Sequence, residues 1–430
     1  MRRHRTLALA CLLAATATQV LGGAATAQAA AAPPAGACHD PNPGRSRVPQ
    51  QPWAQQVLNP MSTWAHSRGA GVLVAVVDSG VDADHPQLSR AGKVQSGRDF
   101  FLTGTFPGNF DCASHGTGVA SIIAADPLPA IGFHGIAPDA TILPVRISDR
   151  DVGDRGETLR IDPQVLANGI RYAADSGAKV INLSLAGYDD FPVVRAAVAH
   201  AVAKDALVVT AAGNGQRDGG AELPSYPAAY DGVLGVGAVD INGATAQGSQ
   251  IGHYVDIVAP GAEVLAATRV DGHAYADGTS FATPFVAATA ALVRAAWPKL
   301  TASEVAQRLI ATASPARGGL GSTAYGAGLV NPYRAVTDGM DTAGPAALPV
   351  HVPVPPDQAH LAQVAWHERV GQVAKWLAAR VACVIVLITL IAVIRPLGRR
   401  RRWQPGWAPV PPAEPAVIEP PEQIFLVTEQ

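Results

Sequence analysis

The sequence predicts an α/β protein with a doubly wound, largely parallel β-sheet covered by helices on both faces, plus one C-terminal transmembrane helix. Helical patterns at 163–177 and 191–205 separate apolar runs, which favours parallel strand pairing. A long apolar segment near the C-terminus indicates the membrane helix. The apolar runs are rich in Val and Ile, as is typical of strands buried on both faces, and they lie at 72–77, 140–147, 179–185, 206–212 and 232–239.

The composition is that of a globular protein. The chain has 430 residues, of which 48% are hydrophobic and 15% are charged, with a formal net charge of −2. A disordered chain would contain far fewer Val, Ile and Leu residues, so that class is excluded. The length allows a sizeable core. The charge balance gives no indication of nucleic acid as a partner.

The N-terminus has the features of an export signal. "MRRHR" is a basic start, an apolar stretch follows it, and small residues near Ala29 offer a cleavage site. We therefore expect residues 1–29 to be a signal peptide; the alternative is an N-terminal helix of the fold. Residues 30–60 are rich in Pro and Gly, and we expect them to form an extended N-terminal arm.

Strands and helices alternate between residues 61 and 335, where we expect the main domain. Gly177 suits the C-terminus of a helix. Thr301 and Glu304 have the spacing of a capping box, which predicts a last helix over 301–313. Residues 336–372 are rich in Pro and Ala and predict a linker to the membrane.

A second apolar segment, at 381–394, predicts one membrane span. Extending it back to residue 373 gives the roughly 20 residues that a bilayer requires. The arginines at 395 and 399–402 follow it directly, and such a basic block stays in the cytoplasm. We therefore expect a span over 373–394, an extracytoplasmic main domain, and a basic, then Pro-rich, cytoplasmic tail over 395–430. The alternative is a buried core helix next to a solvated charge run.

The chain has four cysteines. Cys11 lies in the predicted signal peptide and Cys383 in the predicted span, which leaves Cys38 and Cys112 outside the membrane. An oxidising compartment favours a disulfide between them. Two unpaired thiols are the alternative, and the spacing does not exclude it.

Three candidate polar groups stand at the ends of predicted elements. Asp78 ends the first predicted strand, at the edge where α/β proteins place their sites. His115 starts a helical stretch, although most of the 12 histidines must be ordinary surface or turn residues. Asn214 ends another strand, where its amide can donate a hydrogen bond into a cleft. Gly-Asn-Gly is also an ordinary turn sequence.

The fourth candidate, Ser280, enters a helix that is apolar on nearly all faces. Such a helix lies inside the molecule, and its N-terminus presents free N–H groups and a positive dipole end. A serine there is often only an N-cap. We expect Pro284 to fall in the first turn of this helix, where a missing N–H costs little. A hydroxyl at this place is suited to nucleophilic attack, and the N–H groups are suited to binding an oxyanion.

The order Asp, His, Asn, Ser and the flanking motifs resemble the subtilisin-like serine peptidases. The motifs are "DSGVDADHP", "HGTGVASIIA", "AAGN" and "GTSFATPFVAA", and the resemblance covers roughly 61–335. It implies a catalytic triad of Asp78, His115 and Ser280, with Asn214 as the oxyanion donor.

The segment "NLSLAG" resembles the strand that binds extended peptide in this family. The resemblance implies substrate-binding roles for Ser184, Leu185, Ala186 and Gly187. Ala186 stands where many relatives have glycine, so we expect a narrower cleft on this side.

The arrangement of signal peptide, Pro-rich arm, peptidase domain, linker and one span resembles the mycosins, which are membrane-anchored serine peptidases of actinobacterial type VII secretion systems. The resemblance implies an extracytoplasmic endopeptidase in the cell membrane, a peptide or protein substrate, and partners in the secretion membrane complex. Two alternatives stay open: a structural subunit of that complex with catalysis secondary, and a general exported scavenger protease.

The segment between signal peptide and domain is too short for a folded prodomain. A disulfide between Cys38 and Cys112 would instead fasten the arm beside His115, where the arm would shape the cleft. We expect no metal and no cofactor, because H-E-x-x-H and zinc-type cysteine spacing are lacking. A structural calcium ion is left open.

Overall fold

The computed structural model of the chain describes residues 35–38, 41–102, 105–149, 161–217, 220–317, 319, 321–339 and 358–400. The predicted signal peptide, residues 340–357 of the predicted linker, and the tail from 401 onward lie outside the described residues. The chain divides into two units, Met1–His351 and Val352–Gln430.

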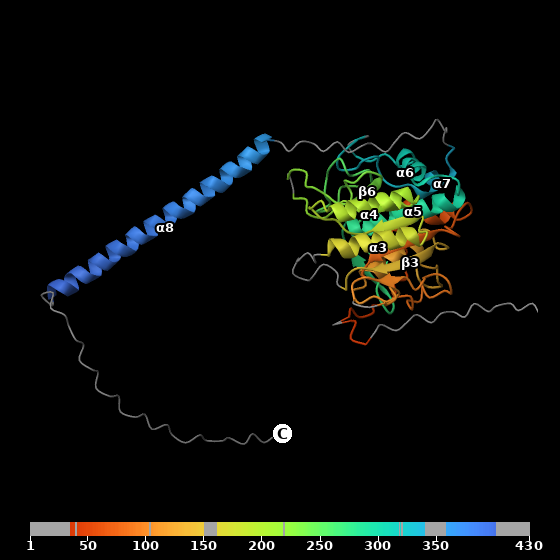
Figure 1. Cartoon of the computed structure of the whole chain (residues 1–430), viewed down its shortest axis with the longest axis horizontal. Helices are drawn as coiled ribbons and strands as arrows, with labels where there is room; N and C mark the ends of the chain where they lie inside the picture. The colour runs from red at the N-terminus through yellow and green to blue at the C-terminus, as the bar shows by residue number, and fades with distance from the viewer. Residues whose placement is uncertain are drawn as a thin grey trace, which may run out of the picture. The chain divides into compact units, whose positions relative to one another are not determined.

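The core of the first unit is a seven-stranded parallel sheet with the strand order β2-β3-β1-β4-β5-β6-β7. Figure 1 shows β3 and β6 of this sheet among the helices α3, α4 and α5. The predicted fold class is therefore confirmed, and all five predicted strands are present. The strands are β1 (Leu73–Asp78), β2 (Arg98–Asp99), β3 (Thr141–Arg146), β4 (Val180–Leu183), β5 (Leu207–Ala211), β6 (Val233–Val239) and β7 (Ile257–Pro260). A separate antiparallel hairpin joins β8 (Val264–Ala267) to β9 (His273–Ala276).

Helices cover both faces of this sheet. Alternate residues of each strand point to opposite sides, so the buried apolar residues of a strand are divided between two cores. Val74 and Val76 of β1 belong to one core, together with residues of α2 and α5. Ala75 and Val77 belong to a second core, with residues of α3 and α4. The covering helices are α2 (His115–Ala124), α3 (Pro163–Asp175), α4 (Pro192–Ala203) and α5 (Thr279–Ala296).

Several helix ends follow the sequence rules. Gly177 comes directly after the C-cap of α3 and has a φ of +84°, as expected for a helix end. Thr301 and Glu304 form the predicted capping box at the start of α6 (Ala302–Ala311). One further helix, α7 (Pro332–Thr337), extends the folded chain slightly beyond the predicted domain end.

The arm is less extended than expected. Residues 41–49 have no regular structure, but α1 (Trp53–Leu58) and the 3-10 helix η1 (Pro60–Thr63) follow. Ala54 and Leu58 of α1 are buried in the same core as α2 and α5. The end of the arm is thus an integral part of the domain.

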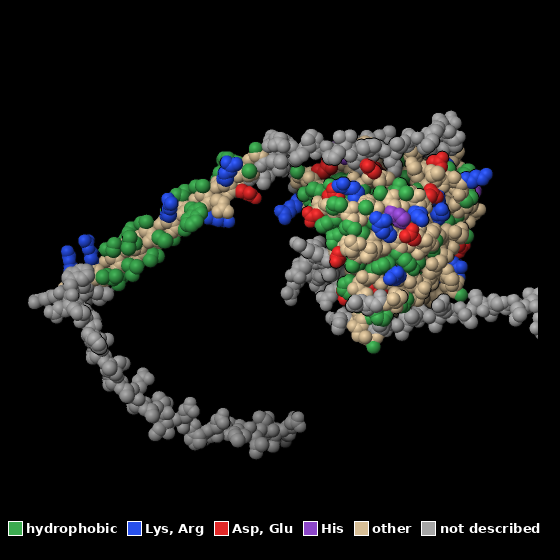
Figure 2. All heavy atoms as spheres, in the orientation of Figure 1, with side chains coloured by type: hydrophobic (Ala, Val, Ile, Leu, Met, Phe, Trp, Pro, Cys, Tyr) green, Lys and Arg blue, Asp and Glu red, His purple; other side chains and the backbone are tan. Residues whose placement is uncertain are grey.

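The second unit contains α8 (Gln358–Arg400), a helix of 43 residues with Pro396 inside it. Among the described residues, only its stretch Ala365–Pro396 is long and apolar enough to cross a membrane. Figure 2 shows hydrophobic side chains gathered along the middle of this helix. The helix fits a membrane anchor, and it begins inside the segment that was expected to be linker.

Candidate active site

The predicted site residues converge on the carboxyl edge of the parallel sheet. β1 ends at Asp78, and the neighbouring strands β4 and β5 run into the segments that carry Ser184 and Asn214. Parallel strands end at the same edge, which is where open α/β sheets bind ligands. Two buried helices, α2 and α5, also begin here, with His115 and Ser280 in their first turns.

Asp78 and His115 are in direct contact. The His115 Nδ1 lies 2.7 Å from the Asp78 Oδ1. The same carboxylate oxygen accepts a hydrogen bond from the Ser79 N–H at 2.7 Å. The side chain of His115 is 12% exposed and that of Asp78 is 7% exposed, so both are shielded from bulk water. A carboxylate in this position fixes the imidazole ring with its proton on Nδ1, which leaves Nε2 as a base.

A buried carboxylate that sequence reasoning missed supports this contact. Asp111 accepts hydrogen bonds from the Ser79 hydroxyl at 3.0 Å and from the Thr117 hydroxyl at 2.6 Å. The Ser79 hydroxyl in turn accepts from the Gly116 N–H at 3.0 Å. Burial raises the pKa of Asp111 above its usual value. The network ties the end of β1 to the start of α2 around the Asp78–His115 pair.

Ser280 is the second residue of α5, and Gly278, with a φ of 124°, is its N-cap. The expectation that Pro284 falls in the first turn is wrong, because Pro284 lies inside the helix. Its missing N–H leaves the Ser280 carbonyl without its usual i+4 donor. The Ser184 hydroxyl donates to this carbonyl instead, at 2.6 Å. The proline thus leaves the Ser280 carbonyl available for a hydrogen bond from Ser184, in the predicted substrate-binding segment.

Asn214 is held against the same helix start. Its Oδ1 accepts from the Thr279 N–H at 2.9 Å and from the Thr279 hydroxyl at 3.0 Å. The amide oxygen is therefore occupied, and the Nδ2 donors are directed elsewhere. A Cβ atom on Gly278 would lie 2.9 Å from Nδ2, so glycine is needed at this position. Asn214 is exposed, and its amide can donate to a bound group.

The segment after β4, which carries the four predicted substrate-binding residues, becomes more exposed along its length. Ala186 and Gly187 are exposed, Leu185 is half-buried and Ser184 is buried. Gly187 exchanges two backbone hydrogen bonds of 2.8 Å with Tyr226. A Cβ atom built on Gly213 would be 3.4 Å from the Ala186 methyl group, so this methyl faces the segment that carries Asn214.

The serine and histidine elements also touch directly. The His115 ring packs edge-on against Phe281, the residue after Ser280, with the ring centroids 5.1 Å apart. The structure therefore places all four predicted catalytic positions at one locus. An oriented imidazole, a hydroxyl at a helix N-terminus and an amide donor are the groups that acyl transfer requires.

The arm is fastened next to this site. Cys38 and Cys112 form a disulfide, as expected, and the Asn42 N–H donates to the Cys112 carbonyl at 2.9 Å. Further along, Arg47 forms an ion pair of 2.8 Å with Asp271 in the β8–β9 turn. The segment just before His115 is thus held by the arm.

No group of three or more His, Cys, Asp or Glu side chains that could hold a metal ion occurs in the described part of the chain.

Comparison with known proteins identifies relatives over this domain. The model of the subtilase family matches residues 69–328. A thermophilic serine proteinase of Bacillus sp. (strain AK1) is 40% identical over 275 residues, which are 64% of this chain and 64% of that protein. Mycosin-4 of Mycobacterium tuberculosis (strain ATCC 25618 / H37Rv) is 38% identical over 333 residues, which are 68% of this chain and 71% of that protein.

A solved structure is similar as well. The serine protease MycP1, described as an essential component of the type VII (ESX-1) secretion system, superimposes with a TM-score of 0.59 and 33% sequence identity. The match covers 70% of this chain and 92% of that structure.

Proposed function

The chain belongs to the subtilase family of serine proteases, and from this premise we propose that it is a membrane-anchored, extracytoplasmic endopeptidase that uses Asp78, His115 and Ser280. The observation that carries the proposal is the 2.7 Å contact between His115 and Asp78 at the edge where α5 begins. The exposed amide of Asn214 beside Thr279 supports it.

In the proposed reaction, the Ser280 Oγ attacks the carbonyl carbon of the scissile peptide bond. The His115 Nε2 takes the hydroxyl proton and later gives it to the leaving amine. Asp78 holds the imidazole in the required tautomer and stabilises its charged form. The Asn214 Nδ2 and the backbone N–H of Ser280 donate to the oxyanion of the tetrahedral intermediate.

The proposed substrate is an extended peptide that lies along residues 184–187. The exposure of Ala186 and Gly187 supports this placement. Both backbone groups of Gly187 are already paired with Tyr226, so we expect main-chain hydrogen bonds to an extended peptide at Ala186 rather than at Gly187. The methyl group of Ala186 restricts the cleft toward Gly213, and we therefore expect small side chains of the substrate to be favoured there.

The proposed context is a type VII secretion system, with the α8 span in the cell membrane and the tail after 400 in the cytoplasm. Mycosin-4 and MycP1 support this context, and so does the apolar stretch Ala365–Pro396. We propose that the substrate is a protein handled by that system and that other subunits of its membrane complex are partners.

A fluorophosphonate probe on the full-length protein in detergent tests the catalytic proposal. We expect labelling of the wild type and none of Ser280→Ala or His115→Ala, because the probe reacts only with an activated serine. A folded wild type that is not labelled, or a Ser280→Ala protein that is labelled equally, contradicts the proposed triad.

An assembly role is the second candidate, favoured by the description of MycP1 as an essential component of its system. Secretion assays in cells separate the two. Loss of secretion with Ser280→Ala supports the catalytic role. Loss only on deletion of the whole chain supports the structural role.

A further inference from the structure

The turn that carries Asn214 rests on one buried residue, Gln250, which lies in the connection between β6 and β7. The side chain of Gln250 is almost completely buried, with 2% of the residue exposed. Its backbone N–H donates to the Gly213 carbonyl at 2.9 Å. Its Oε1 accepts from the Gly215 N–H at 3.4 Å. Gln250 thus binds the residues on both sides of Asn214.

The fit between Gln250 and this turn is close. Gly213 has a φ of +102°, and a Cβ atom there would lie 2.0 Å from the Gln250 Oε1. The carboxamide therefore lies directly on the Gly213 Cα, in space that any other residue would need for its side chain. Packing of this kind leaves the turn little freedom to move toward Gln250.

The amide nitrogen of the carboxamide bonds to the segment that leads to Tyr226. The Gln250 Nε2 donates to the Pro224 carbonyl at 3.4 Å and to the Tyr254 hydroxyl at 3.3 Å. The Tyr254 hydroxyl donates to the Leu223 carbonyl at 2.8 Å. Burial raises the pKa of Tyr254 to about 12, so the hydroxyl keeps its proton. Two residues after Pro224, Tyr226 exchanges backbone hydrogen bonds with Gly187 of the predicted substrate-binding segment.

The Asn214 turn is therefore held from two sides. Thr279 binds the Asn214 side-chain oxygen and the Gly213 N–H, the latter at 3.1 Å. Gln250 binds the backbone carbonyl of Gly213 and the N–H of Gly215. Thr279 orients the amide, whereas Gln250 fixes the backbone from which the amide projects.

We propose that Gln250 is a positioning residue of the active site, which holds the 213–215 turn so that the Asn214 amide stays aimed at the oxyanion. The proposal rests on the proposed function, because it assigns Gln250 a role through Asn214. A donor stabilises an oxyanion only if it is already in place when the charge develops. A turn that relaxes therefore lowers kcat more than it weakens substrate binding.

A double-mutant cycle in the full-length protein tests the role. Gln250→Met keeps the length of the side chain and removes its hydrogen bonds. We expect kcat on a peptide substrate to fall about 10-fold, less than the 10²–10³ that loss of an oxyanion donor costs. In an Asn214→Ala background the same change should alter kcat by less than about twofold, because positioned pairs are not additive. The matched control is Gln247→Met, since Gln247 is an exposed residue of the same connection. It should leave kcat unchanged in both the wild-type and the Asn214→Ala backgrounds.

Hydrogen–deuterium exchange gives a readout that does not need activity. In a Ser280→Ala background, Gln250→Met should raise exchange at the N–H groups of Gly213 and Gln216. Their acceptors are Thr279 and Gly248, not Gln250, so faster exchange there reports a loosened turn. If Gln250→Met does not fold, Gln250→Asn replaces it. Asn keeps an amide but is one methylene shorter, so this variant should also raise exchange at Gly213 and Gln216.

The outcomes separate the two proposals. An equal fall of kcat with and without Asn214, or unchanged exchange at Gly213 and Gln216, overturns the role of Gln250. A wild type without serine-dependent hydrolysis contradicts the proposed function instead, and the exchange experiment still decides whether Gln250 holds the turn.

Discussion

Gly116 lies directly after His115, and the contact between His115 and Asp78 depends on its missing side chain. A Cβ atom on Gly116 would lie 2.0 Å from the Gly80 carbonyl oxygen and 3.1 Å from the Asp78 Cβ. The first turn of α2 can therefore approach the end of β1 only with glycine at this position. The contact between the His115 imidazole and the Asp78 carboxylate therefore depends on the close approach of the backbone at Gly116 to the end of β1.

We expect Gly116→Ala to push α2 away from β1. Overpacking of this kind costs about 1–3 kcal/mol of the free energy of unfolding. A displacement of about 1 Å at the pair should lower kcat/KM about 100-fold. Denaturant unfolding and peptide hydrolysis measure the two effects. Gly339→Ala, where an added Cβ meets nothing within 4 Å, is the control, and a Gly116→Ala enzyme as active as this control contradicts the argument.

The main polar residues of the site could be predicted from their places in the sequence. Asp78 ends a Val-rich run, and His115 and Ser280 begin apolar helical stretches, so parallel topology brings them to one edge. Asp111 and Thr279 could not be predicted in the same way. Their roles arise from bonds to Ser79 and Asn214, which are 32 and 65 residues away in the sequence, and no local pattern reports such bonds.

Prediction of whole elements failed where tertiary contacts override local preference. β7 has only four residues, and the β8–β9 hairpin is rich in alanine, so neither has a strong strand pattern. Pro284 was expected in the first turn, where its missing N–H would cost little. The bond from Ser184 to the Ser280 carbonyl lets the proline lie deeper in α5.

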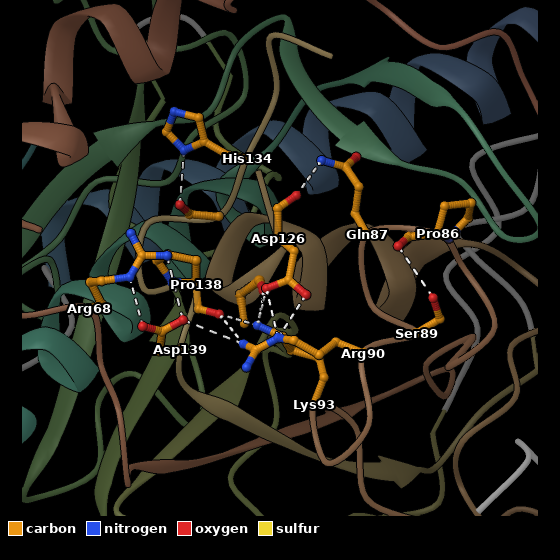
Figure 3. A network of polar contacts seen from close by, with 12 residues as sticks. Arg68, Pro86, Gln87, Ser89, Arg90, Lys93, Asp126, His134, Pro138 and Asp139 are labelled. Carbon is orange, nitrogen blue, oxygen red and sulfur yellow. Dashed lines mark hydrogen bonds and ion pairs between the residues drawn. The ribbon is translucent and has the colours of Figure 1, made fainter. Parts of the chain in front are cut away.

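The end of α2 farthest from His115 is joined to the segment before β3 by a buried cation, Lys93 (Figure 3). The Lys93 side chain is 0% exposed and lies 2.8 Å from the Asp126 carboxylate. It also donates to the carbonyls of Ala124, at 2.9 Å, and of Pro138. Burial lowers the pKa of Lys93, and Asp126 opposes this effect.

We expect Asp126→Asn to leave Lys93 as a buried charge without its counter-ion. Removing one partner of a buried pair costs about 3–5 kcal/mol of unfolding free energy. Asp139→Asn breaks the nearby Arg68 pair, in which both side chains are about a third exposed, and should cost at most about 1 kcal/mol. Urea unfolding of both variants is the measurement, and equal losses would show that Lys93 does not depend on Asp126.

The arm connects distant parts of the first unit, since it is bonded near His115 and again at the β8–β9 hairpin. The Cys38–Cys112 disulfide spans 74 residues of sequence. The Arg45 N–H donates to the Asp271 carbonyl at 2.9 Å, and Ser46 accepts from the His273 N–H at 3.1 Å. A segment without regular structure is thus kept in place by a covalent bond and by bonds to an ordered hairpin.

We expect the paired change Cys38→Ser and Cys112→Ser to loosen the arm. In the chain-entropy account, a disulfide that closes a loop of this length stabilises the folded state by about 4 kcal/mol. Without it, we expect residues 41–48 to open locally before the domain unfolds. Limited proteolysis and hydrogen exchange of the arm measure it. Cys383→Ser, outside the disulfide, is the control; an arm equally protected in both proteins would mean that its hydrogen bonds suffice.

The hairpin under the arm contains a histidine that must stay neutral, which makes the stability of the first unit depend on pH. The His273 Nδ1 accepts from the Val48 N–H at 3.3 Å, and its Nε2 lies 2.7 Å from the Gln87 Oε1. His85 lies nearby, with ring centroids 6.2 Å apart, and Arg47 and Asp271 contribute charges. Burial, and then the repulsion of His85, lower the pKa of His273 to about 4.

Because the pKa of His273 is lower in the folded state than its ordinary value of 6.5, the unfolded chain binds more protons between about pH 6.5 and pH 4. The contribution of His273 to the free energy of unfolding should therefore be fully present above about pH 6.5 and be lost as the pH drops toward 4. Protonation of Nδ1 also removes the acceptor of the Val48 N–H, so the arm should loosen over the same range. Burial lowers the pKa of His85 and His134 as well, and they add to the slope with the same sign.

Denaturant unfolding at a series of pH values tests this in the wild type and in His273→Asn. The variant should be less stable than the wild type at about pH 7.5, since it loses the bonds to Val48 and Gln87, but its stability should fall less on acidification. His253→Asn changes an exposed histidine and should keep the wild-type slope. If His273→Asn and the wild type lose stability in parallel, protonation of His273 does not release the arm, and the acid sensitivity of the domain must come from other groups.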